Sequence, residues 1–170
     1  VNGTGDRADA LNLTETQEIF QITVSKGSLG RLTPKHMKLK LKLVLDKTEP
    51  KVEFNPDAPN ENGYYCGNVN VGITVADPEE YSGIDKVEYA VVNGEMEPTE
   101  YEPEPLYTHK EEKEILSSCT RSITVKAENH NFKNVRVYVK VTDLAGNVYV
   151  TKENACLLHI CTDKPEVSVS

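Results

Sequence analysis

Acidic side chains at the ends of predicted strands are the residues of this chain best suited to bind a metal ion. They are Asp77, Glu79, Glu80, Asp85 and Asp143. Carboxylate oxygens of this kind are the ligands that calcium prefers. A turn is the other interpretation, because Asp143 and Asn147 bracket Gly146, and Asp and Asn side chains bond backbone amides in such hairpins. The sequence has no D-x-D-x-D-G loop, so we predict the turn and no cofactor, with calcium as the alternative.

Tyrosine rings form the second candidate set. The chain has eight tyrosines and no tryptophan. The tyrosines expected at loops or strand starts are Tyr64, Tyr65, Tyr81, Tyr101 and Tyr107. Aromatic rings at such positions can bind sugars, but tyrosines there more often pack the ring on a sandwich edge and leave the hydroxyl in water. We therefore expect a packing role, and we expect Tyr89 in the core.

The cysteines are the third set, and they are Cys66, Cys119, Cys156 and Cys161. None has C-x-x-C spacing and the four histidines do not cluster near them, so a zinc site is not expected. On one regular strand Cys156 and Cys161 would face opposite sides, which disfavours a bond between them. Small buried thiols are the preferred interpretation and one disulfide is the alternative, with the pairing left open.

Motifs of catalysis are missing from the sequence. It contains no G-x-S-x-G elbow, no H-E-x-x-H helix and no phosphate-binding loop, so we predict that the protein is not an enzyme. The net charge of −8 argues against nucleic acid or anionic membranes as partners. No apolar run reaches the ~18 residues that a membrane-spanning helix needs.

Apolar and polar residues alternate along most of the chain. The clearest runs are 52–54, 69–75, 87–91, 123–127, 135–141, 148–150 and 158–160. Such runs bury one face and wet the other, which predicts antiparallel strands in a sandwich of two sheets. Residues 110–116 are expected as a surface loop or a single helical turn. Residues 95–105 carry three prolines among acids and are expected to be extended and exposed.

Residues 1–45 predict a polar tail followed by a β-hairpin. Its strands are residues 19–24 and 36–43, and its inward side chains are Leu39, Leu41, Leu43 and Leu45. Two strands cannot bury such a face alone. Either the hairpin ends a preceding module, which we prefer, or it docks on the domain that follows.

Four segments resemble, in order, parts of the bacterial immunoglobulin-like modules of large secreted or wall-attached proteins. They are residues 46–50, 63–71, 82–89 and 135–147. They are similar to that family's Asp-x-Thr-x-Pro joint, its Gly-Tyr-Tyr strand, its Ser-Gly-Ile strand and its strand ending in Thr-Asp-x-Ala-Gly-Asn. Cys66 departs from the pattern, because a small polar residue is more usual there.

A short motif of Asp-Lys, then Pro, one residue and Val occurs twice, at residues 46–52, where Thr-Glu precedes the proline, and at residues 163–167, where the proline follows Lys directly. Its prolines, Pro50 and Pro165, are 115 residues apart (165 − 50 = 115), about the length of one sandwich. This predicts an N-terminal segment 1–45, a complete module 46–163, and the start of a following module or linker at 164–170. Because the chain begins at Val rather than Met, we expect a fragment of a longer protein.

The resemblance implies an immunoglobulin-like antiparallel β-sandwich, with the extra N-terminal hairpin, on the outside of a bacterial cell. The function it implies is that of a non-catalytic spacer or an adhesion and protein-interaction module. The alternative is an accessory carbohydrate-binding module of a secreted glycoside-processing enzyme. Expected partners are neighbouring modules of the same polypeptide, and a host or cell-surface protein or glycan.

Overall fold

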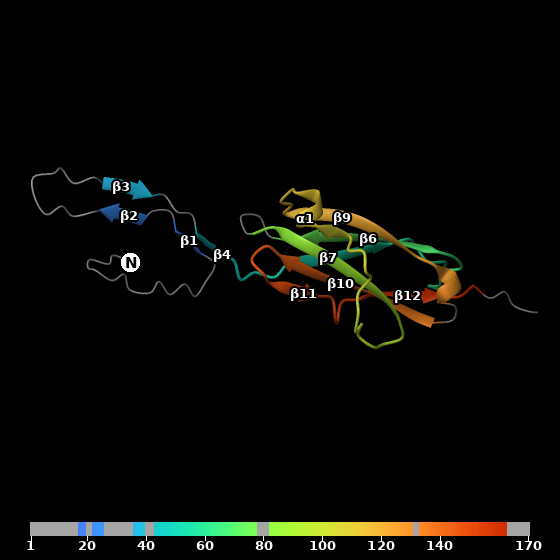
Figure 1. Ribbon diagram of the computed structural model, residues 1–170. Coiled ribbons are helices and arrows are strands. Elements are labelled where there is room, and N and C mark those ends of the chain that lie inside the picture. Colours follow the sequence, from blue (N-terminus) through green and yellow to red (C-terminus); the bar gives the residue numbers. More distant parts are fainter. Residues whose placement is uncertain are drawn as a thin grey trace, which may run out of the picture. The chain divides into compact units, whose positions relative to one another are not determined.

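The computed structural model describes residues 17–19, 22–25, 36–39, 43–77, 82–130 and 133–162 (Figure 1). Its contacts divide the chain into two units, Val1–Thr48 and Glu49–Ser170. Each unit is described by itself. Within the described ranges, no helix is both long enough and apolar enough to cross a membrane.

The first unit contains two antiparallel strand pairs. β1 (Gln17–Ile19) pairs with β4 (Leu43–Leu45), and β2 (Ile22–Ser25) pairs with β3 (His36–Leu39). The β2–β3 pair matches the predicted hairpin. The predicted inward leucines lie outside the side chains that the structure describes.

The first sheet of the second unit has three antiparallel strands in the order β5-β6-β9. Their bounds are β5 (Lys51–Pro56), β6 (Val69–Ala76) and β9 (Ser118–Val125). On the central strand every second side chain is buried, as the alternating pattern predicts: Val69, Val71, Ile73 and Val75. The sheet therefore presents one continuous apolar face.

The second sheet is built around one long strand, β10. Its members are β7 (Ile84–Asn93), β8 (Tyr107–Thr108), β10 (Lys133–Asp143), β11 (Val148–Val150) and β12 (Cys156–Ile160). β10 pairs with β7 on one edge, and β8 pairs with the far edge of β7. The other edge of β10 is shared by β11 and β12. The predicted all-β sandwich of two antiparallel sheets is thus confirmed.

Thr151 fills the gap between the two short strands that share one edge of β10. Its backbone N–H donates to the Val139 carbonyl at 3.0 Å, and its Oγ1 accepts the Val139 N–H at 2.9 Å. Both polar groups of Val139 are therefore bonded although neither β11 nor β12 reaches it. A buried backbone group left unbonded would be costly.

Helical structure is minor in the part of the chain that the structure describes. It consists of one turn of α-helix, α1 (His109–Glu112), and one 3-10 turn, η1 (Ala127–Asn129). The prediction of a loop or single turn near residues 110–116 is confirmed.

The core lies between the two sheets and is rich in valine. The inward residues of β10, which are Val135, Val137, Val139 and Val141, are each 0% exposed. They belong to one cluster with the inward residues of β6 and β9. Each fully buried side chain of this size contributes about 1.5–3 kcal/mol, so this interface holds the sheets together.

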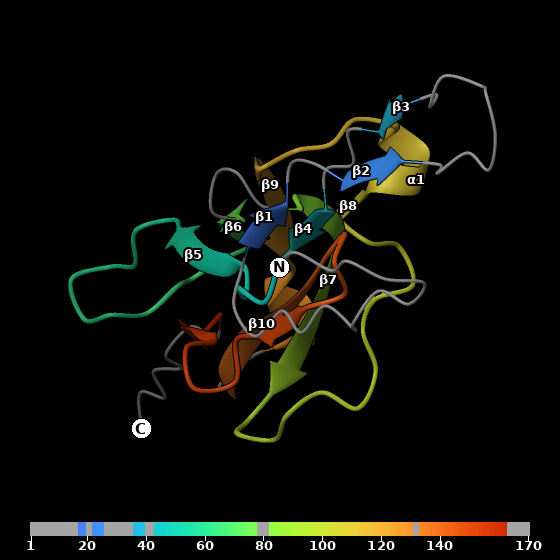
Figure 2. The same cartoon turned by 90° about the vertical axis from the view of Figure 1, so that its left-hand side faces the viewer.

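Three residues break the predicted alternation, and one of them is Val148 on β11, which is 44% exposed although the pattern places it inward. The pattern places Ala90 and Tyr138 on the water side of their strands, but they are 4% and 2% exposed. The segment 94–106 lies beside Ala90, because its backbone follows β7 and its amides at Glu102 and Leu106 each donate to a β7 carbonyl at 2.8 Å, and Tyr138 is paired with Ala90 on β10. In Figure 2 this segment is the yellow-green arch beside β7. The prediction that Ala90 and Tyr138 face water is therefore wrong.

The sandwich has two ends, each named here by two residues. At the aspartate end, Asp77 follows β6 and Asp143 closes β10. At the bridge end, Tyr65 and Ile160 form a parallel bridge. The eleven residues of β10 separate the two ends.

The second unit is entered by the chain at one end and left at the other (Figure 1). Lys51 begins β5 and pairs with Ala76, the last residue of β6, at the aspartate end. Ile160 ends β12 and pairs with Lys133, the first residue of β10, at the bridge end. The module is thus traversed from end to end.

Candidate functional site

Two buried carboxylates meet at the aspartate end. Asp77 is 2% exposed and Asp143 is 1% exposed, and a carboxylate oxygen of one lies within 4.8 Å of one from the other. The predicted candidates Asp77 and Asp143 are therefore brought together. A buried carboxylate needs hydrogen bonds or an opposite charge, so its partners decide what it does.

Asp143 uses its carboxylate to close the turn between β10 and β11. Oδ1 accepts the Asn147 backbone N–H and Oδ2 accepts the Asn147 side-chain amide, both at 2.8 Å. Gly146 supplies the positive φ of 93° that the turn requires. This is the turn that the sequence predicts.

Asp77 closes a second loop at the same end. Its Oδ2 accepts the Gly83 N–H at 2.6 Å, within a loop whose residues 78–81 lie outside the described range. Gly83 has a φ of 87°, and a Cβ on it would lie 2.7 Å from the Ile115 side chain. Only glycine fits at this position. The Asp77 carboxylate therefore accepts a hydrogen bond from the backbone amide of a residue that must be glycine.

The remaining acidic candidates do not join this pair. Glu79 and Glu80 lie outside the described residues, and Asp85 is a half-buried residue on β7 outside the carboxylate cluster. Two buried carboxylates this close could accept a cation between them. However, Asp77 and Asp143 each already accept a hydrogen bond from a backbone amide. These bonds fix the two loops, so the carboxylates have a structural role. Calcium stays the alternative prediction.

The candidate tyrosines are dispersed over the unit. Tyr64 is 49% exposed, and its ring centroid is 6.0 Å from that of His159 at the bridge end. Tyr101 lies with its ring 5.4 Å below the Lys140 ammonium, on the outer face of the second sheet. The remaining three are Tyr65, which is half-buried, Tyr107, which is 2% exposed, and Tyr81, which lies outside the described residues.

Tyr65 and Tyr107 serve the fold through their hydroxyl groups. Tyr65 donates to the Asp57 carbonyl at 2.8 Å, and Tyr107 donates to the Glu114 carbonyl at 2.5 Å. Burial raises the pKa of both hydroxyls, which keeps them as donors. These contacts agree with the packing role that the sequence predicts, and these rings do not form a shared platform with Tyr64 or Tyr101.

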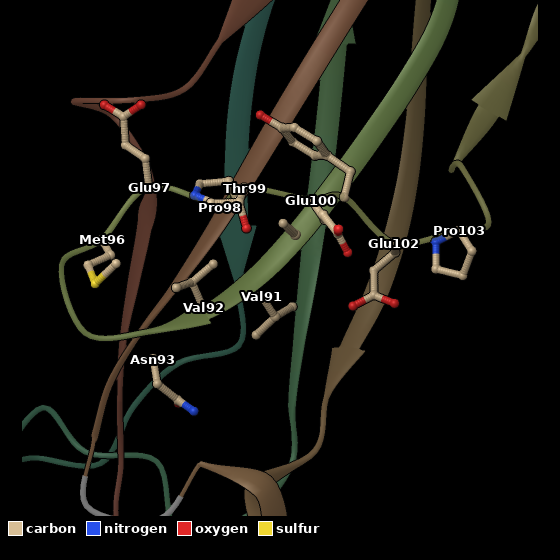
Figure 3. A pocket seen from close by; sticks show the side chains of 12 residues that line it. Val91, Val92, Asn93, Met96, Glu97, Pro98, Thr99, Glu100, Glu102 and Pro103 are labelled. Carbon is tan, nitrogen blue, oxygen red and sulfur yellow. The ribbon is translucent and has the colours of Figure 1, made fainter.

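A shallow groove of ≈ 480 Å³ lies between the end of β7 and the 94–103 segment (Figure 3). Ala90, Val92 and Met96 supply apolar lining. Figure 3 shows carboxylates spaced along the segment, and these belong to Glu97, Glu100 and Glu102. The prolines of this segment indicate an extended chain, but no local pattern indicates that it docks on β7, so the sequence did not predict the groove.

Glu88 forms a charged cluster on the outer face of β7. Its carboxylate lies 2.6 Å from the Lys86 ammonium and 3.2 Å from that of Lys140 on β10. Partial burial by itself would raise the pKa of Glu88, but the bonds from the two lysines outweigh it and lower the pKa. The cluster joins β7 to β10 on the face opposite the core.

Comparison with known proteins gives no match: no family model, no curated protein and no solved structure matches this chain. The family resemblance of the four sequence segments therefore stays a prediction.

We predict that Asp143→Ala lowers the free energy of unfolding by about 1–3 kcal/mol, because it leaves the Asn147 amides without their acceptor. Urea denaturation measures this. Asp85→Ala is the matched control, since it removes a charge on β7 outside the pair, and it should change stability by less than about 0.5 kcal/mol. Equal losses in the two variants would contradict a structural role for Asp143.

A second prediction concerns pH. The lysine contacts lower the pKa of Glu88 in the folded state, so its contribution to stability is full above the ordinary glutamate pKa of about 4.3 and is lost as the pH falls through the lowered pKa. Glu88→Gln should be about 1 kcal/mol less stable than the native chain at pH 7. That difference should vanish in acid.

The control is Glu53→Gln, an exposed position on β5. Its stability should follow that of the native chain across the same pH series. A Glu88→Gln deficit that persists unchanged at low pH would show that the lysine contacts are not its cause.

Proposed function

We propose that the second unit is a non-catalytic, immunoglobulin-like spacer module of a bacterial surface protein, joined to neighbouring modules at its two ends. Adhesion or protein contact through its sides belongs to the same proposal. The observation that carries it is that the chain enters at the aspartate end and leaves at the bridge end.

The strand order supports this proposal. Immunoglobulin sandwiches place strands A, B and E in one sheet and C, F and G in the other. In the same chain order, the three-stranded sheet here is β5-β6-β9, and β7, β10 and β12 are neighbours in the other. β8 extends the β7 edge of the second sheet. The four sequence segments that resemble bacterial modules are consistent with this arrangement.

The hydrogen-bond geometry supports a role in transmitting force. Hydrogen bonds of antiparallel pairs are perpendicular to the strands. A pull on the two ends of the unit acts along β5 and β12, so it loads all of the bonds of each strand together instead of opening them one by one. The ladders of β5 with β6 and of β12 with β10 are thus sheared.

Carbohydrate binding has less support. Its one specific observation is exposed Tyr64 beside His159. The other described tyrosine candidates are either bonded into the fold or lie elsewhere on the unit, so the rings do not form a platform. Saturable binding of a polysaccharide, abolished by Tyr64→Ala, would overturn the spacer proposal in favour of this alternative.

Force spectroscopy tests the spacer proposal. The full chain is held between two reference domains and pulled from its ends in reducing buffer. Unfolding of residues 49–162 should give one force peak and release roughly 35 nm of chain. The control pulls between Glu61, in the loop that joins β5 to β6 at the bridge end, and Thr162, two residues after β12 ends there. It should need a clearly lower force, because there the strands are peeled and their bonds break in turn.

Equal forces in the two directions would contradict the proposal, and so would end-to-end extension without a peak. A glycan-binding panel measured on the same protein separates the spacer from the carbohydrate-binding alternative.

A further inference from the structure

Two cysteines come to neighbouring positions at the bridge end, although 95 residues separate them in the sequence (161 − 66 = 95). The Tyr65 N–H donates to the His159 carbonyl at 2.9 Å. The Cys161 N–H donates to the Tyr65 carbonyl, also at 2.9 Å. These bonds pair Tyr65 with Ile160 in parallel. The next residue on one side is Cys66 and on the other is Cys161, so the two lie side by side.

Both cysteine side chains reach the surface of the second unit. Cys66 is exposed and lies in a bend of the chain, and Cys161 is half-exposed. Ile160, the residue before Cys161, is 1% exposed.

The distance between the two backbones suits a covalent bond. Adjacent β-segments lie about 4.8 Å apart, and a disulfide spans Cα separations of about 4.4–6.8 Å. As a thiol, Cys66 accepts a weak hydrogen bond on Sγ from the Asn60 side-chain amide at 3.6 Å.

The other two cysteines are placed differently. Cys119 lies on β9 opposite Val75, near the aspartate end, and Cys156 lies on β12 opposite Val137. Both are buried, and burial raises the pKa of both thiols, which keeps them protonated and slow to react. Cys66 and Cys161 therefore differ from Cys119 and Cys156 in two ways: they follow the two residues of one backbone bridge, and they are accessible to solvent.

We propose that Cys66 and Cys161 form a disulfide that fastens the end of β12 to the segment preceding β6. The oxidant is a small disulfide such as glutathione disulfide, or a protein disulfide of the same chemistry. The exposed Cys66 thiolate attacks it, forming a mixed disulfide and releasing one thiol. The Cys161 thiolate then attacks the Cys66 sulfur and releases the second thiol. Two electrons and two protons pass from the cysteines to the oxidant.

The disulfide deepens the proposed spacer function, on which its biological meaning rests. β12 is the last strand before the chain leaves the unit, and the bond joins its end to the other sheet. A pull from the C-terminal side would then pass through a covalent bond directly into the first sheet. Residues 66–161 would form a covalently closed loop, so a pull on the two ends of the chain could not extend them.

Peptide mapping tests the pairing. The full chain is incubated in a buffer of oxidised and reduced glutathione, alkylated, digested without reductant and analysed by mass spectrometry. One linked pair of peptides, containing Cys66 and Cys161, is expected, with Cys119 and Cys156 alkylated only after unfolding. Links that involve Cys119 or Cys156, or alkylation of both Cys66 and Cys161, would overturn the proposal.

Variants test the consequence for stability. Closing a loop of this length should raise the melting temperature of the oxidised chain above that of the reduced chain by on the order of 10 °C. Cys66→Ser and Cys161→Ser should each abolish this difference, and both positions are accessible enough to keep the fold. Cys119→Ala and Cys156→Ala are the matched controls and should keep it. If a control variant does not fold, the peptide map of the native chain decides.

The force experiment separates the disulfide from the spacer proposal. In oxidising buffer, only residues 49–65 and residue 162 of the range 49–162 can extend, so the released length, after the folded distance between the two ends is subtracted, should fall to roughly 3 nm. A full-length release in both buffers would contradict the disulfide while leaving the spacer function in place. Equal forces along the two pulling directions in reducing buffer would contradict the spacer function while leaving the disulfide in place.

Discussion

Both sheets of the second unit depend on the packing and pairing of one strand, β10. Its inward face gives the core four fully buried valines, and its two edges bond β7 on one side and β11 and β12 on the other. A strand in this position has to keep every backbone polar group bonded, which explains why Thr151 completes the pairing at Val139. The eleven residues of β10 thus bury apolar side chains in the core and have backbone groups that are hydrogen-bonded along both edges of the strand.

The ends of β10 determine what the two ends of the module contain. At its C-terminal end, Asp143 and Asp77 are buried and fix two loops through backbone amides. Near its N-terminal end, β12 stops, and Tyr65, in the segment between β5 and β6, adds a parallel bridge to Ile160. Carboxylates with amide partners stiffen the end where the chain enters, and backbone pairing between that segment and β12 holds the end where it leaves. A spacer needs both ends to be firm.

Local patterns in the sequence were sufficient for much of this structure. The alternation at 69–75 and 135–141 predicted the core strands, and Asp143 with Gly146 and Asn147 predicted the turn, because neighbouring residues determine both features. The burial of Ala90 was not predictable, since Ala90 lies beside a segment that docks on β7 through two backbone bonds. The proximity of Cys66 and Cys161 also escaped prediction, because it follows from one bridge between residues 95 positions apart. Features that arise from contacts between residues far apart in the chain, and that leave no local pattern of side chains, could not be predicted from the sequence.

The chain enters the second unit at one end and leaves it at the other. A distance measurement between spectroscopic labels at Lys51 and Thr162, attached by a chemistry that does not use cysteine, tests this arrangement. Because β10 has eleven residues and joins the two ends, we expect one distance of about 35 Å. A distance below about 20 Å would place the points of entry and exit at the same end and would exclude a spacer joined at opposite ends.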